Sequence, residues 1–175
     1  LEGFGSGLAI EEGSLAIERG LILDATFFGA INRSGMLTGT DLRIERVTES
    51  LGEGGGVACS DGGTCSLTRF SLGELVTYGA VAVGDGSTLS LETGSIRDVR
   101  ASSTYGIGRG IEVHSGGGGT VRDVSIDGVV ETGIVAFALD EMGFLHDTQL
   151  SLTDVRVSGV AERPCVSSTC PTEGG

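Results

Sequence analysis

Three aspartates in similar contexts are the first residues of this chain whose types and spacing could do chemistry. Asp98, Asp123 and Asp154 each lie in a short apolar stretch, and each directly precedes a valine. If these stretches align in a stacked fold, the carboxylates lie about 5 Å apart, which is the spacing that retaining glycoside hydrolysis uses. Arg122 directly precedes Asp123 and could act beside it. Stacked carboxylates could also hold Ca²⁺, which takes about six to eight oxygen ligands.

The same residues also have a purely structural interpretation. Aspartate is a common turn residue at the ends of strands. An arginine beside it on a sheet surface forms a solvated ion pair of small energetic value. Stacking would then repeat similar residues from coil to coil without any chemistry.

Two histidines add a second kind of candidate. His114 shares a strand face with Glu112, so the carboxylate could orient the imidazole as a general base. His146 is followed by Asp147. His114 also suits a surface loop, since a run of four glycines begins at Gly116, and His146 suits a loop as well.

Four cysteines form two close pairs, Cys59 with Cys65 and Cys165 with Cys170. One zinc ion could use four cysteines, but in a stacked fold the two pairs would lie about 19 Å apart, at about 4.8 Å for each coil between them. We therefore expect two local disulfides, one at a corner loop and one at the end of the stack. Disulfides imply an extracytoplasmic location, that is periplasm, cell surface or secretion. Reduced thiols in a cytosolic protein remain the alternative.

The elements that would position these residues form an internal repeat. A glycine followed by an aliphatic stretch recurs at intervals of 22 to 31 residues. A second and often a third short apolar segment with alternating pattern follows each anchor, separated by turn-forming Gly, Ser, Thr and Asp. Such strands bury their apolar faces only when neighbouring coils cover one another. The anchor glycines are Gly7, Gly29, Gly56, Gly79, Gly110 and Gly133, and Pro164-Cys165-Val166 is a degenerate seventh copy.

This repeat resembles the right-handed parallel β-helix proteins, the architecture of pectin-lyase-like enzymes and of many surface and passenger domains. The resemblance covers about residues 7–166 and leaves 167–175 as a cap or tail. It rests on the repeat, because the paired-aspartate and His-Gly motifs of polygalacturonases are absent. In pectate lyases, which are similar in fold, calcium-binding aspartates and an arginine base carry the reaction. If the aspartate face of this chain is catalytic, the resemblance implies the same calcium- and arginine-dependent chemistry there.

We therefore expect an all-β chain, with residues 1–175 forming one right-handed single-stranded parallel β-helix of six or seven coils, as a whole protein or a piece of a longer one. Glycines are expected to provide positive φ at the corners. Leucine-rich repeats lack support because their asparagine signature is missing, and the aligned glycines argue against an antiparallel sandwich. The segment 134–142 could be a short helix, but its place directly after an anchor glycine favours a strand.

Composition limits the partners. The formal net charge is −13, with 11 basic and 24 acidic residues, which argues against nucleic acid and anionic lipid. The longest uncharged stretch, residues 75–84, is too short to span a membrane. We expect a non-catalytic surface, adhesion or scaffold module, with a carbohydrate or another cell-surface component as partner. The alternative is a polysaccharide lyase or glycoside hydrolase that uses the Asp/Arg face. No cofactor is expected, apart from the calcium that such a face could bind.

Overall fold

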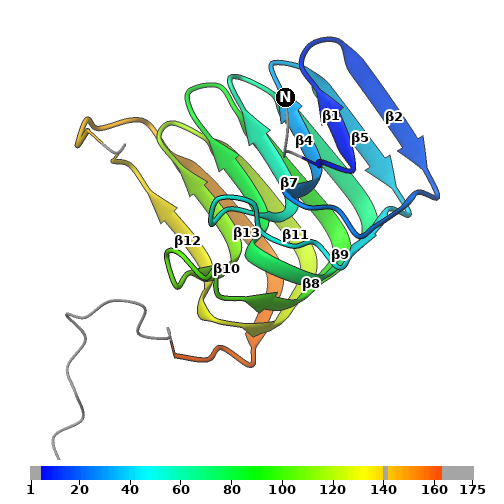
Figure 1. Cartoon of the computed structure of the whole chain (residues 1–175). Helices are drawn as coiled ribbons and strands as arrows, with labels where there is room; N and C mark the ends of the chain where they lie inside the picture. Colours follow the sequence, from blue (N-terminus) through cyan, green and yellow to red (C-terminus); the bar gives the residue numbers. More distant parts are fainter. Residues whose placement is uncertain (1–4, 140–141, 163–175) are drawn as a thin grey trace, which may run out of the picture.

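The computed structural model describes residues 5–139 and 142–162, and this part of the chain is an all-β solenoid (Figure 1). The coils follow one another along a single axis from β1 at one end to β13 at the other. All pairings between the named strands are parallel. The predicted fold class, a parallel β-helix, is confirmed.

Each coil contributes to two sheets, which we call sheet A and sheet B. The long strand β8 (Thr64–Val83) runs through sheet B and continues into sheet A. The other strands of sheet A are β1 (Leu8–Ile10), β4 (Phe28–Arg33), β7 (Gly55–Ser60), β10 (Gly108–His114) and β12 (Glu131–Phe137). The other strands of sheet B are β2 (Ser14–Glu18), β3 (Leu21–Leu23), β5 (Met36–Thr40), β6 (Arg43–Glu45), β9 (Thr88–Arg100), β11 (Gly118–Val129) and β13 (Gln149–Ser158).

The described residues form about five turns, not the expected six or seven. The six anchor glycines mark six stacked strands of sheet A, and six strands are separated by five turns. The proposed seventh copy, Pro164-Cys165-Val166, lies outside the described residues, and so does the expected cap or tail at 167–175. The segment after the last anchor is a strand as far as Phe137, which confirms the strand interpretation over the helix for residues 134–137.

Columns of aliphatic side chains fill the space inside the coils. One column of sheet B contains Leu37, Cys65 and Leu89 on successive coils, and each is at most 1% exposed. A column of sheet A contains Ala30, Val57, Ala80 and Ile111, and all four are fully buried. The alternating sequence pattern thus places every second residue in one continuous core.

The anchor glycines stand in one column, but their role differs from the one expected. None of the six has positive φ. At Gly79, a Cβ atom would lie 2.3 Å from the carbonyl oxygen of Gly110 and 2.4 Å from Cγ2 of Ile96. The glycines are therefore required because coil backbone and the branched side chains of sheet B approach closely there.

The positive-φ corners of sheet B contain mostly residues other than glycine. One corner column divides sheet B into two halves and has φ of 52° to 55° in Arg19, Asp41, Arg69, Thr93, Asp123 and Asp154. The second corner column ends sheet B and contains Asp24, Arg46, Glu74, Asp98, Gly128 and Gly159, with φ of 54° to 66°. The expectation that glycine supplies these corners is therefore wrong at most positions. Aspartate tolerates the left-handed region because its short polar side chain bonds locally. The structure gives no such account of arginine there.

A buried carboxylate on the outer side of sheet B links two coils across the coil between them. The Glu45 side chain is 6% exposed, and its Oε1 accepts hydrogen bonds of 2.7 Å from Nη2 of Arg43 and from Nη2 of Arg97. Gly73 lies between Glu45 and Arg97 in the same column. The absence of a side chain at Gly73 leaves the space that Arg97 crosses.

This contact predicts a specific acid sensitivity. The hydrogen bond from Arg43 lowers the pKa of Glu45; burial opposes the shift, and the bond from Arg97 adds to it. A lowered folded-state pKa stabilises the fold at pH values above the ordinary glutamate pKa of 4.5, and this contribution disappears as the pH falls through the folded-state pKa. We expect urea unfolding of Glu45→Gln to show a smaller loss of stability below pH 4.5 than the parent chain shows. Gly73→Ala displaces Arg97, so its loss of stability at low pH should lie between those of Glu45→Gln and the parent chain. Identical pH profiles for all three proteins would contradict the role of Glu45.

Candidate functional site

The three candidate aspartates do not form one ladder. Asp123 stands opposite Asp154 in the first corner column, so these two carboxylates are on neighbouring coils. Asp98 belongs to the second corner column and stands opposite Gly128. The expected stacking of all three is therefore wrong. The reason is that each coil has two left-handed corners, and similar short motifs precede a valine at both.

The surroundings of these aspartates are exposed. Asp123 accepts a hydrogen bond from Thr93 Oγ1 at 3.3 Å. Arg122 lines a shallow depression of about 380 Å³ on sheet B, together with Glu92 and hydroxyl side chains of neighbouring coils. In residues 5–139 and 142–162, no three His, Cys, Asp or Glu side chains gather closely enough to hold a metal ion.

Two other corner aspartates form the best ion pairs of these columns. Arg69 donates to both oxygens of Asp41, at 2.7 and 2.9 Å. Arg46 binds Asp24 on the neighbouring coil in the same way. These hydrogen bonds lower the pKa of Asp41 and of Asp24. Corner aspartates therefore act in coil-to-coil contacts, which is the structural interpretation that the sequence left open.

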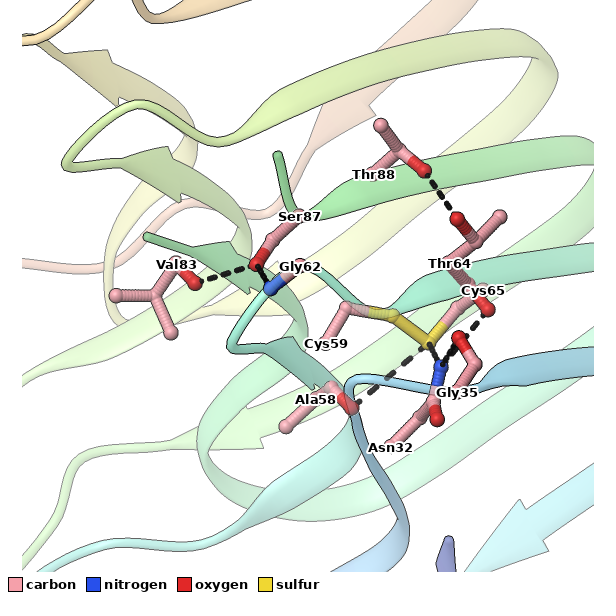
Figure 2. Close-up of a disulfide and its surroundings, with 10 residues drawn as sticks. All are labelled: Asn32, Gly35, Ala58, Cys59, Gly62, Thr64, Cys65, Val83, Ser87 and Thr88. Carbon is pink, nitrogen blue, oxygen red and sulfur yellow. Dashed lines mark hydrogen bonds between the residues drawn. A yellow bond between two sulfur atoms is a disulfide. The ribbon is translucent and has the colours of Figure 1, made fainter. Parts of the chain in front are cut away.

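The first predicted disulfide, Cys59–Cys65, is present, and both cysteines are fully buried. Figure 2 shows it joining the end of β7 to β8 across the turn between sheets A and B. The only asparagine of the chain, Asn32, lies beside it. Its Nδ2 donates to the carbonyl oxygens of Gly35 and Thr64, both at 2.9 Å. The second predicted pair, Cys165 and Cys170, lies outside the described residues.

Removal of this disulfide should weaken the fold measurably. Closing so short a loop stabilises by about 2 kcal/mol in the chain-entropy model. We expect a double Cys59→Ala/Cys65→Ala variant to lose about that much in urea unfolding followed by circular dichroism. The matched control is the parent chain unfolded in reductant, which should approach the variant. A variant as stable as the oxidised parent would show that the disulfide does not stabilise this turn.

A second apolar cluster lies outside the coils, on the outer face of sheet A. Phe28, Ile31, Ala58 and Val81 are 4 to 8% exposed although their side chains point away from the interior core. The sequence contains the signal for this cluster, because residues 79–83 form an uninterrupted apolar run. Strands that are apolar on both sides are typically covered on both sides. Sequence reasoning missed the cluster because it interpreted this run only as a repeat anchor.

This cluster forms the floor of a groove of about 480 Å³. The groove crosses the strands of sheet A from β4 to β12, four steps of about 4.8 Å, or about 19 Å in total. Its polar lining includes Arg33, Glu53, Ser60, Glu112 and His114. The apolar lining is Phe27, Phe28, Ile31, Ala58, Tyr78, Val81, Val83, Phe137 and Leu139.

An ion network is fixed within this face. The Glu112 side chain is 2% exposed, and its Oε2 accepts a hydrogen bond from Arg109 Nη1 at 2.6 Å. Arg109 Nε also donates to Glu131 Oε2 at 2.9 Å. Burial opposes the charge of Arg109, but the hydrogen bonds to Glu131 and Glu112 outweigh it, and the pKa of Arg109 is raised. Arg109 and Glu131 were not among the residues that the sequence singled out.

The structure brings His114 and Glu112 together, one of the two arrangements that the sequence left open for this histidine. The distance from His114 Nε2 to Glu112 Oε1 is 3.4 Å. The imidazole stacks on the ring of Phe137 with centroids 4.8 Å apart, and its Nδ1 lies 2.8 Å from Ser115 Oγ. This arrangement orients the imidazole at the edge of the groove. The other histidine, His146, lies 3.0 Å from Asp85, in the turn after β8 and two coils away along the stack.

The pKa of the Tyr78 phenol depends on the polarity and charge of the groove. Burial raises the pKa of its phenol, and the negative charges of Glu112 and Glu53 act in the same direction. The raised folded-state pKa means that neutral Tyr78 contributes stability below the ordinary pKa of 10.0, and this contribution is lost as the pH rises further. In a Tyr105→Phe variant, where Tyr78 is the remaining tyrosine, we expect little tyrosinate absorbance at pH 10 in the folded state. Urea should restore normal ionisation. Normal titration in the folded protein would place Tyr78 in solvent.

The fold and this groove define a parallel β-solenoid with an apolar, partly charged outer face on one sheet. No protein-family model, curated protein or solved structure matches the chain. In the described residues, no helix is long and apolar enough to cross a membrane.

Proposed function

We propose that the protein is an extracytoplasmic surface or adhesion module that binds a carbohydrate chain along the outer groove of sheet A. The observation that carries this proposal is the apolar cluster outside the coils. A solenoid face that only meets water has no need of clustered aromatic and aliphatic side chains, and apolar grooves with a few polar groups are typical ligand sites.

The chemistry of the groove supports a sugar ligand. Aromatic rings supply apolar faces for sugar rings, and a few placed polar groups orient the ligand. Phe28 and Tyr78 stand in one column with Gly55 between them. Ser60 and His114 stand in another outward column, on the far side of the column that contains Ala58 and Val81. The groove length of about 19 Å fits an extended chain better than a single small molecule. The resemblance to β-helix surface and passenger domains supports the same reading, as does the disulfide for an oxidising compartment.

Oligosaccharide binding tests the proposal. The chain would be screened against immobilised neutral and acidic glycans, and affinities measured by calorimetry. We expect Tyr78→Ala to weaken binding at least tenfold. Thr120→Ala, an exposed hydroxyl on sheet B, is the matched control and should leave affinity unchanged. Circular dichroism would verify the fold of both. Absence of glycan binding, or binding that Tyr78→Ala leaves intact, would overturn the proposal.

Cleavage of the bound carbohydrate is the second candidate function. The contact of His114 with buried Glu112 favours it, because a carboxylate-oriented imidazole is suited to general base chemistry. The competing location for catalysis is the Asp/Arg face, on which the sequence suggested a lyase or hydrolase. Incubation with acidic polysaccharides, with and without Ca²⁺, distinguishes them: His114→Gln should abolish cleavage at the groove, and Asp123→Asn should abolish cleavage at the corner. No cleavage under either condition excludes both.

A further inference from the structure

The last described coil exposes side chains that belong to core columns. Leu152 and Val157 of β13 are 48% and 42% exposed. Their column neighbours one coil earlier, Val121 and Ile126, are at most 1% exposed. The described residues place no further strand on the outer edge of β13, so its backbone groups and its core side chains face outward. An edge of this kind is a template for another strand.

The first coil presents the complementary edge. Leu15, Ile17 and Ile22 of β2 and β3 are only partly buried against the core. They occupy the same columns as Leu150, Leu152 and Val157 of β13. The two ends of the stack therefore match in register and in apolar character.

The corner column adds charge complementarity. It begins with Arg19 on the first coil and ends with Asp154 on the last described coil. Inside the stack, an aspartate and an arginine on neighbouring coils of this column form a bidentate pair, as Asp41 and Arg69 show. If a first coil follows a last coil, Arg19 stands directly above Asp154 and can make the same contact.

We infer that the outer edge of β13 docks the first coil of a second copy, so that copies stack head to tail along the solenoid axis. β2 and β3 of one copy pair in parallel with β13 of the next, and the three apolar columns continue across the junction. The contact joins two different surfaces, so it generates open rods and not closed dimers. The net charge of −13 on each copy opposes association, and salt screens this repulsion.

Sedimentation velocity of the full 175-residue chain over a range of protein and salt concentrations tests this inference. We expect the weight-average mass to rise continuously with protein concentration, and to rise further with added salt. Arg19→Asp and Asp154→Arg should each weaken association at least tenfold, and the double variant should recover it. Arg100→Asp and Asp98→Arg are matched controls that change the charge equally on the interior coil that contains β9, away from the column of Arg19 and Asp154.

Each result decides the question. Recovery in the double variant, with unchanged controls, establishes the Arg19–Asp154 junction. A chain that remains monomeric at all concentrations overturns the inference, and so does a closed dimer of fixed mass. Association that the end variants and the controls affect equally also overturns it, because general charge would then explain the effect.

Discussion

Replacing Gly79 with alanine is expected to lower the free energy of unfolding by about 3 kcal/mol, the upper range for forcing atoms into a packed core. The added Cβ would lie 2.3 Å from the Gly110 carbonyl oxygen and 2.4 Å from Ile96 Cγ2. The first contact is with backbone, which cannot rotate away. Relief requires neighbouring coils to separate, and this weakens the parallel pairing of β8 with β10. Urea unfolding followed by circular dichroism measures the loss.

Gly118→Ala is the matched control for this prediction. Gly118 also lies in a strand of the stack, but a Cβ there meets nothing closer than 3.8 Å and its φ is not positive. We expect it to change stability by less than about 0.5 kcal/mol. If Gly79→Ala were as well tolerated as Gly118→Ala, the spacing of the coils would have to be looser than the structure shows.

Replacing Arg109 with methionine is expected to cost about 3 to 5 kcal/mol of stability at neutral pH, as removal of one partner of a buried ion pair does. Glu112 would keep its negative charge at 2% exposure without its 2.6 Å partner. Glu131 would lose both of its hydrogen bonds to Arg109.

The double variant Arg109→Met/Glu112→Met separates a buried charge from lost packing. Replacing both partners by apolar groups removes the desolvation penalty, so the double variant should be more stable than Arg109→Met alone. Both would be measured by urea unfolding at neutral pH, followed by circular dichroism. A double variant that is less stable than the single one would mean that the contact of Glu112 with His114 outweighs the cost of its unpaired buried charge, and the importance of Arg109 would have to be revised.

The repeat made the architecture predictable. Glycine anchors followed by short alternating strands led to stacked parallel coils, and Cys59–Cys65 followed from the close spacing of the two residues. The number of turns was overestimated because each anchor glycine marks one strand of sheet A, and six strands are separated by only five turns. The conformational role of the anchor glycines was also misjudged: neighbouring backbone, not positive φ, excludes a side chain at Gly79.

The candidate site was less predictable. Glu112 and His114 were recognised because residues two apart in a strand share a face. Arg109 joins them through the same strand, but Glu131 and Phe137 come from the next coil and Phe28 and Tyr78 from earlier ones. The aspartate ladder failed for a related reason, since matching motifs at Asp98 and Asp123 occupy different corners.

What the sequence by itself determined is local and periodic: strand alternation, a recurring anchor glycine, one short disulfide and a strongly acidic composition. These depend on a few neighbouring residues and on the requirement that short apolar strands cover one another. Only the tertiary structure decided which residues of different coils meet. Intervals of 22 to 31 residues leave the register of each coil open, and that register is settled by simultaneous packing in the core and at the corners. The outer groove of sheet A, the Arg109 network and the complementary ends of the stack all result from it.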